Sequence, residues 1–232
     1  MSQKNIMILS GAGLSAASGL KTFRDSGGLW EEYDVKEVCS IEGFRDNPLK
    51  VLDFYDERRA QLAKVEPNKA HEIIANIKEK YPKNVHILTQ NVDDLLEKAG
   101  CKEVVHLHGF LPELRCSVCS FVFYIGYESY KGKICPKCAS KSVRHNIVMF
   151  GEQAPEYVRL YRLLEIIDLL VVIGTSGEVL PIDRFAMHSP RSILNNLDDP
   201  YNIAIYFSKS YIEPATSALP KIQNGIDEFM EA

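Results

Sequence analysis

A glycine-rich turn directly after a short apolar run most constrains what this chain can fold into. Residues 5–10, NIMILS, have the composition of a short buried strand. The next residues place Gly11, Gly13 and Ala16 in the spacing G-x-G-x-x-G/A. After a strand, such small residues permit a tight turn and let backbone N–H groups approach a pyrophosphate at a helix start. The same glycines would also serve a tight turn with no ligand, so this spacing alone leaves both interpretations open.

The segment that follows differs from the pattern of an ordinary dehydrogenase. That pattern needs a second strand with an acidic residue near its end, roughly 20 residues after the glycines, to bind a ribose hydroxyl. Glu31, Glu32 and Asp34 lie at about that distance, but residues 21–30, KTFRDSGGLW, contain no strand-like run that would position them. A long polar loop of this kind is usually functional or mobile rather than packed, and it could fold over a bound cofactor.

Strand-like and helix-like segments alternate along most of the chain. The predicted strands are 5–10, 84–91, 103–109, the second half of 156–177, and 201–207. The predicted helices are 67–81, 92–100, the first half of 156–177, and 218–232. Strands separated by helices predict an α/β fold with a Rossmann-like parallel sheet and helices on both faces. A ligand cleft would then lie outside the carboxyl ends of the strands.

Two segments interrupt this alternation. Residues 35–65 are polar and mostly helical, whereas residues 111–146 are turn-rich and carry four cysteines. We expect both to form a smaller domain, made of a helical insertion and a zinc-binding module. The larger Rossmann-like domain would consist of residues 1–34, 66–110 and 147–232.

The four cysteines of the second insertion form two CxxC pairs, Cys116/Cys119 and Cys135/Cys138, separated by residues 120–134. This spacing is typical of a zinc ribbon. Four thiolates give a closed tetrahedral site with no open position for water, so we expect one structural Zn²⁺ that takes no part in catalysis. In a reducing compartment such pairs favour a metal over disulfides.

Composition argues against several other classes of protein. The net charge of −4 does not suit a broad nucleic-acid surface, which needs clustered Lys and Arg. The longest apolar run, residues 166–173, is interrupted by Asp168 and too short to cross a bilayer. The start of the chain lacks the features of a signal or transit peptide. These observations predict a cytoplasmic protein without nucleic-acid or membrane partners, and we expect it to act as a monomer.

Several motifs occur together in an order that resembles the sirtuins, a family of NAD-consuming protein-lysine deacylases. They are GAGLSAASGLKTFRDSGGLW (11–30), EPNKAH (66–71), TQNVD (89–93), HLHG (106–109), the two CxxC pairs, IVMFGE (147–152) and GTSGEVLP (174–181). The resemblance weakens after Pro181. Lys21 and Glu213 stand where many relatives have proline and glycine.

The resemblance implies that NAD is consumed as a co-substrate. The carbonyl oxygen of an acylated lysine attacks C1′ of the nicotinamide ribose, nicotinamide leaves, and the acyl group ends on ADP-ribose. His108 matches the family's catalytic histidine, and an imidazole pKa of about 6.5 suits proton abstraction near neutral pH. His106 lies two residues earlier on the same face of the predicted strand, so the residues alone do not choose between the two.

The resemblance also implies which residues contact NAD. Gln90, Asn91 and Asp93 would bind the carboxamide and ribose hydroxyls, although Asn and Asp also serve as helix caps. Asn195 could replace Asn196 at the adenosine ribose after a one-residue slip. The implied contacts are Gly11, Ala12, Gly13, Ser15, Ala16, Phe23, Arg24, Trp30, Gln90, Asn91, Val92, Asp93, Gly174, Thr175, Ser176, Asn196, Leu197, Asp198 and Ala215.

The acyl group of the substrate is implied by Tyr55 and Arg58, which lie three residues apart and hence on one face of a predicted helix. They match the Y-x-x-R feature of class III sirtuins, which prefer succinyl- and malonyl-lysine. Arginine can bind a carboxylate through two hydrogen bonds. The alternative is a solvated helix face with Asp56–Arg59 or Glu57–Arg58 pairs.

Two further segments resemble the strands between which the family binds its peptide. VMFGE and GEVLP would hold the substrate backbone as an added strand, a mode that tolerates many sequences. Val148 and Phe150 would equally suit a protein core. The implied substrate contacts are Val148, Phe150, Gly151, Glu178 and Val179.

The sequence therefore predicts an NAD-dependent protein-lysine deacylase that acts on acylated proteins. It would remove succinyl and malonyl groups, and also acetyl groups, and release nicotinamide and 2′-O-acyl-ADP-ribose. The alternatives are a plain NAD-dependent deacetylase, an NAD-linked oxidoreductase, and a zinc-ribbon module that binds without turnover. ADP-ribosyl transfer to protein is a possible side activity of the same cofactor cleavage.

Overall fold

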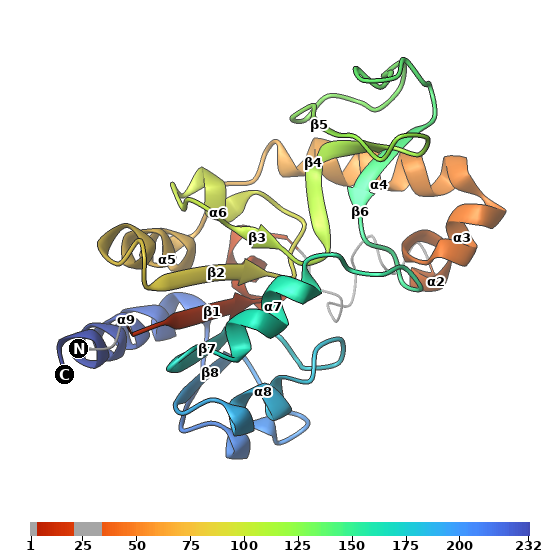
Figure 1. Ribbon diagram of the computed structural model, residues 1–232. Helices are drawn as coiled ribbons and strands as arrows, with labels where there is room; N and C mark the ends of the chain where they lie inside the picture. Colours follow the sequence, from red (N-terminus) through yellow and green to blue (C-terminus); the bar gives the residue numbers. More distant parts are fainter. Residues whose placement is uncertain (1–3, 21–33) are drawn as a thin grey trace.

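The computed structural model describes residues 4–20 and 34–232, and a six-stranded sheet forms its centre (Figure 1). The strands are β1 (Ile6–Ser10), β2 (Val85–Thr89), β3 (Val105–His106), β7 (Leu169–Ile173), β8 (Ser192–Asn196) and β9 (Lys209–Ile212). Their spatial order is β3-β2-β1-β7-β8-β9, and every pairing is parallel. This is the strand order of a Rossmann-like sheet. The chain adds strands outward on one side of β1 and then crosses to the other side at β7, so the strand order reverses there. The predicted fold class is confirmed.

Helices cover both faces of this sheet because its central strands are apolar on both sides. Every residue of β1 and β7 is buried. Ile8 packs in the cluster on one face and Leu9 in the cluster on the other, as side chains alternate across the sheet. The first face carries α5 (Lys69–Lys80), α6 (Leu95–Lys98) and α9 (Ala215–Glu231), and the second carries α7 (Tyr157–Leu164) and α8 (Ile182–His188).

The prediction of a strand at residues 201–207 is wrong. These residues instead contain the 3₁₀ helix η3 (Ile203–Tyr206). The Asp199 carboxylate accepts hydrogen bonds from the N–H groups of Ile203 and Ala204, which favours the helical turn. Ile203, Ala204 and Phe207 pack in the cluster that α8 joins on one face of the sheet, whereas Ile205 is exposed. The strands β8 and β9, which flank this segment in the sequence, extend the sheet in its place.

Two other predicted elements are present but shorter than expected. Only the four residues of α6 are helical within 92–100, and only the two residues of β3 join the parallel sheet within 103–109. Asp93 accepts a hydrogen bond from the N–H of Leu95, so the residues between β2 and α6 form a turn. Residues 90–93 and His108 are therefore in loops at the end of the sheet.

A second, antiparallel sheet and three helices lie beside the parallel sheet (Figure 1). Its strands, in the order β5-β4-β6, are β4 (Gly109–Cys116), β5 (Val122–Tyr124) and β6 (Val143–Ile147). The helices are α2 (Val35–Cys39), α3 (Ile41–Asp46) and α4 (Pro48–Leu62). Phe54 of α4 shares a buried cluster with Leu111 of β4 and Ile147 of β6. The two insertions thus pack on each other, while their boundaries as a separate domain stay a prediction.

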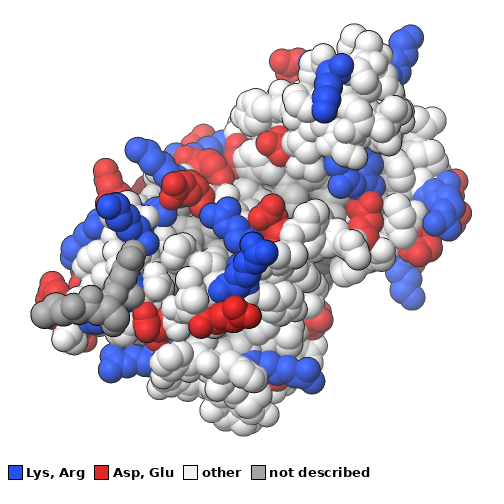
Figure 2. Space-filling view, in the orientation of Figure 1, with Lys and Arg blue, Asp and Glu red and all other residues white. Residues whose placement is uncertain are grey.

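The described surface gives two further facts. None of the described helices is both long enough and apolar enough to cross a bilayer. On the face shown in Figure 2, acidic and basic side chains are interspersed rather than gathered by sign. This pattern is usual for a solvated surface.

Candidate active site

A cavity of about 1190 Å³ opens beyond the carboxyl ends of β1, β2, β7 and β8. It lies where the strand order reverses, which is the crevice in which parallel α/β sheets bind ligands. The turns after these four strands form one wall. Residues of α4 and the segment after β6 form the other wall. This volume exceeds the usual range of ligand pockets, about 300–1,000 Å³, and suits a dinucleotide together with a second substrate.

The turn after β1 is interlocked with the turn after β7. The chain after β1 continues as two short 3₁₀ helices, η1 (Ala12–Leu14) and η2 (Ala16–Ser18). The N–H of Gly13 donates to the carbonyl of Gly174 over 2.9 Å. A Cβ atom on Gly13 would lie 2.7 Å from the Gly174 Cα, and Gly174 itself has φ +65°. Packing between the two turns, in addition to any ligand, therefore requires glycine at both positions.

A polar cluster joins the first turn to the turn after β2. The Asn91 amide donates to the Ser15 hydroxyl over 3.1 Å, and that hydroxyl donates to Asp93 over 3.0 Å. His71 of α5 contacts the same hydroxyl at 3.4 Å through Nε2. Burial lowers the pKa of His71 to about 4, so it is neutral at pH 7. The Ser15 side chain makes no cap hydrogen bond to η2, whereas Asp93 both joins the cluster and accepts a hydrogen bond from the first N–H of α6.

His108 faces the cavity from the loop between β3 and β4. Its Nδ1 lies 3.1 Å from the carbonyl oxygen of Gln90, and its Nε2 lies 2.9 Å from the Tyr157 hydroxyl. Burial lowers the pKa of His108, and the Gln90 carbonyl acts in the opposite direction. The neutral imidazole that a general base requires is therefore favoured at pH 7.

His106 has different surroundings, which separates the two candidate histidines. Its Nε2 lies 2.8 Å from the Glu97 carboxylate and its Nδ1 lies 2.9 Å from the Asn91 carbonyl. Burial lowers the pKa of His106, but Glu97 and Asn91 outweigh this effect and leave the pKa above its ordinary value. His106 is not among the residues that line the cavity. The geometry therefore favours His108 as the base.

The far end of the cavity is bounded by the turns after β7 and β8. The Gln90 amide donates to the Thr175 hydroxyl over 3.0 Å, and the Asn196 amide donates to the Thr175 carbonyl over 2.9 Å. The Asn195 amide instead donates to two carbonyls at the end of β9. Both asparagines line the cavity, and their separate roles toward a ribose stay a prediction.

Tyr55 and Arg58 of α4 line the cavity together with Cys39. The Tyr55 hydroxyl donates to the Cys39 sulfur over 3.4 Å, and the Arg58 guanidinium lies 5.8 Å from the centroid of the Phe54 ring. Burial raises the pKa of the Cys39 thiol to about 11, so that thiol is neutral. Among the described residues that line the cavity, Arg58 is the one Lys or Arg side chain.

The alternative of a solvated helix face is wrong for the neighbouring residues Asp56 and Arg59. These two form an ion pair at 3.3 Å, but Arg59 is fully buried. Its guanidinium donates to the carbonyl of Leu111 over 2.8 Å and contacts Nδ1 of His145 at 2.7 Å. This residue therefore joins α4 to the antiparallel sheet.

The segment after β6 forms one edge of the cavity. The N–H of Val148 donates to the carbonyl of His108, and Phe150 exchanges backbone hydrogen bonds with Cys39 and Ile41. The side chains of Phe150 and Val179 are 49% and 50% exposed, so neither belongs to a protein core. Both apolar side chains are therefore accessible at the edge of the cavity.

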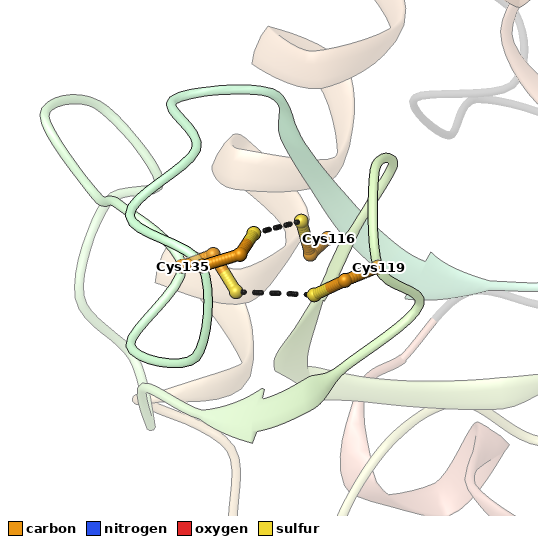
Figure 3. Close-up of side chains that lie close together, drawn as sticks. Cys116, Cys119 and Cys135 are labelled. Carbon is orange, nitrogen blue, oxygen red and sulfur yellow. Dashed lines mark hydrogen bonds between the residues drawn. The ribbon is translucent and has the colours of Figure 1, made fainter.

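The four cysteines of the antiparallel sheet bring their sulfur atoms together (Figure 3), all within 4.8 Å of one another. The Cys116–Cys138 and Cys119–Cys135 sulfur pairs are 3.6 Å apart. A tetrahedral Zn²⁺ with bonds of about 2.3 Å places its sulfurs about 3.8 Å apart, whereas a disulfide needs about 2 Å. The donor set thus fits one structural zinc. None of the four lines the cavity.

Every predicted nucleotide-binding or substrate residue that the structure describes lines this one cavity. Phe23, Arg24 and Trp30 lie outside the described residues. Sequence reasoning missed Tyr157 and Cys39, which also line the cavity. Neither has a local signal, since each reaches the site only through the packing of its helix.

The fold and the site together define a dinucleotide-binding α/β protein with a histidine lining its nucleotide cleft and a four-cysteine metal module outside that cleft. The family model described as the Sir2 family matches residues 11–181. The chain belongs to this family.

Relatives and solved structures agree with this membership. An NAD-dependent protein deacylase of Campylobacter jejuni is 64% identical over 228 residues, covering 98% of each chain. One of Helicobacter hepaticus is 41% identical and covers 97% of this chain and 98% of its own. A Sir2 homologue mutant with ADP ribose superposes with a TM-score of 0.85 at 32% identity, covering 98% of this chain and 94% of its own. A Sir2 homologue–NAD complex gives 0.83 at 33% identity, with 97% and 90% covered.

Proposed function

We propose that this chain is an NAD-dependent protein-lysine deacylase whose acyl pocket prefers the acidic succinyl and malonyl groups and also accepts acetyl. It would transfer the acyl group to ADP-ribose and release nicotinamide. Membership of the Sir2 family and the name shared by its relatives support the deacylase activity. Location in the cytoplasm and action as a monomer stay predictions from the sequence.

The placement of Tyr55 and Arg58 carries the preference for acidic acyl groups. Both side chains lie on the wall of the cavity that also holds His108. Burial lowers the pKa of Arg58, whereas the nearby Asp93 carboxylate raises it. Because the pKa of a guanidinium is so high, Arg58 stays charged throughout the working pH range. A carboxylate at the end of an acyl chain would receive charge-assisted hydrogen bonds from Arg58, which a methyl group would not.

The remaining residues have definite tasks in this proposal. The two glycine turns would bind the pyrophosphate through backbone N–H groups. The cluster of Ser15, Asn91 and Asp93 would orient the carboxamide of the nicotinamide ring and the ribose attached to that ring. His108 would accept a proton at Nε2 from a ribose hydroxyl as that oxygen attacks the acyl carbon. The zinc would stabilise the antiparallel sheet and take no part in these steps.

An oxidoreductase with the same cofactor is a poor match for this geometry. In a dehydrogenase the strand beside β1 follows soon after the glycine turn and ends in the ribose-binding carboxylate. Here the strand beside β1 on that side is β2, which begins only at Val85. Recovery of reduced cofactor, with no nicotinamide released, would instead support the oxidoreductase.

The test compares Arg58→Met with the wild type on one peptide carrying either succinyl-lysine or acetyl-lysine. Mass spectrometry of the products gives kcat/KM for each. We expect the variant to lose about 10- to 100-fold on the succinylated peptide, equivalent to one charged hydrogen-bonding contact, and to keep its acetyl activity. His108→Ala should lose both activities. Equal losses of Arg58→Met on both peptides would reject the acidic pocket, and intact NAD after long incubation would reject the deacylase.

A further inference from the structure

The hydrogen bonds of His108 define which of its nitrogens carries the proton. Nδ1 lies 3.1 Å from the Gln90 carbonyl oxygen, which can only accept a hydrogen bond. The proton of the neutral imidazole is therefore on Nδ1, and the lone pair is on Nε2. The Tyr157 hydroxyl lies 2.9 Å from Nε2 and so donates to that lone pair. The atom that would accept a proton in catalysis is thus covered by a tyrosine.

The helix that carries this tyrosine directs it toward His108. Tyr157 is the first residue of α7, and its ring packs against the apolar cluster beneath that face of the sheet. Its edge meets the Tyr161 ring at a centroid distance of 6.4 Å, and Tyr161 in turn meets Phe185 of α8 at 6.2 Å. Tyr161 is 49% exposed, so this packing directs the Tyr157 ring toward His108 without locking it in place. The hydroxyl therefore reaches Nε2 because of the packing of α7.

We infer that Tyr157 is a positioning residue for His108, which holds the imidazole in the tautomer required of the base and covers Nε2 until the ribose hydroxyl arrives. This inference rests on the proposed deacylase function. The arriving hydroxyl replaces the Tyr157 hydroxyl at Nε2, donates its own proton there and becomes the nucleophile. One hydrogen bond is exchanged for another, so the base is not left without a partner before reaction.

The electrostatic surroundings of His108 make this role measurable. The groups that face its ring are the Gln90 carbonyl at the end of β2 and the Tyr157 hydroxyl on α7. Across residues 4–20 and 34–232, no ion pair involves this imidazole. A hydroxyl that donates to Nε2 stabilises the neutral ring, in the same direction as burial. Removing it should raise the pKa of His108.

The experiment compares Tyr157→Phe with the wild type and with Tyr161→Phe as the matched control. Both variants keep their rings and lose one hydroxyl, but only Tyr157 contacts His108. The pKa of His108 is measured by NMR titration of isotope-labelled histidines, assigned with His108→Ala, in enzyme without NAD or peptide. We expect Tyr157→Phe to raise this pKa by about half to one pH unit. The acidic limb of kcat/KM should move to higher pH by the same amount, and Tyr161→Phe should change neither.

The possible outcomes separate this inference from the proposed function. An unchanged His108 pKa in Tyr157→Phe would overturn the positioning role, and so would an equal shift in Tyr161→Phe. The titration requires no turnover, so it reports on Tyr157 even if the reaction has been wrongly assigned. Failure of the wild type to consume NAD with a modified peptide would instead refute the deacylase.

Discussion

Arg58 and Arg59 follow one another in α4, yet they face different parts of the molecule. Arg58 lines the cavity, whereas Arg59 is fully buried and bonds to β4 and β6 through Leu111 and His145. Burial lowers the pKa of Arg59 to about 10, so its guanidinium stays charged at neutral pH and is stabilised by these acceptors. Arg58 would thus bind the proposed substrate, whereas Arg59 attaches α4 to the antiparallel sheet.

This contrast predicts different effects on stability. Arg59→Met removes the buried guanidinium and leaves its acceptors without a donor, so the free energy of unfolding should fall by about 3 kcal/mol. Arg58→Met, next to it in the same helix, should change it by less than about 1 kcal/mol. Urea denaturation at pH 7 measures both. Similar losses in the two variants would contradict the structural assignment of Arg59.

At this scale the sequence identified the cavity-lining residues well, because the sirtuin resemblance assigns roles to short motifs. It could not separate His106 from His108, since the difference lies in Glu97, which approaches His106 from α6. Nor could it find Arg59. An arginine beside an aspartate in a helix has the same local pattern whether its face meets water or another sheet.

At the scale of elements, the start of α5 links the helix to the nucleotide turn. Asn68 caps the helix by accepting a hydrogen bond from the N–H of Ala70, and its amide donates to the Leu14 carbonyl and the Ser18 hydroxyl. His71, three residues later, completes a capping box with the N–H of Asn68 and contacts Ser15. The same residues thus begin the helix and position the turn.

Two caps provide a matched test of this linkage. Asn68→Ala and Asn47→Ala each remove an N-cap, from α5 and α4 respectively, and each should lower the free energy of unfolding by about 1 kcal/mol. Only Asn68→Ala should also raise the KM for NAD, roughly five-fold if about 1 kcal/mol of binding is lost. Steady-state kinetics at saturating peptide decides this. An equal KM in the two variants would show that the cap and the turn are independent.

The prediction of strands is correct where an apolar run is buried in the sheet. It is wrong where a side-chain hydrogen bond caps a helical turn. The apolar runs of β1, β2 and β7 were identified because each is buried on both faces. Residues 201–207 have an equally apolar pattern. There the Asp199 carboxylate accepts a hydrogen bond from the N–H of Ile203, four residues later, and caps a helical turn instead. A propensity argument does not weigh such a side-chain hydrogen bond.

At the scale of the whole molecule, the zinc-binding sheet frames the loop that carries His108. Its strand β4 begins at Gly109, directly after His108, and β6 ends at Ile147, directly before Val148. The N–H of Val148 then donates to the carbonyl of His108 over 2.9 Å. Two continuous strands therefore connect the metal module with His108, although the cysteines do not line the cavity.

Metal exchange should separate the support of the fold from the chemistry. Chelation of zinc should lower the thermal midpoint by roughly 5 °C or more, as expected for a loss of at least about 2 kcal/mol, and activity should fall with it. Cobalt bound by the same four thiolates should restore both the thermal midpoint and kcat, and its visible spectrum should report tetrahedral sulfur ligation. A cobalt enzyme that is folded but inactive would give the metal a direct part in the reaction.

The interlocked turns of Gly13 and Gly174 restrict how this protein can vary over generations. Each position already carries the smallest residue, so a change at one cannot be accommodated by trimming the other. No compensating pair of substitutions exists at this contact. Sequences that descend from this chain must therefore keep both glycines or change the backbone of both turns. The loops and pocket walls around the two turns are not restricted in this way.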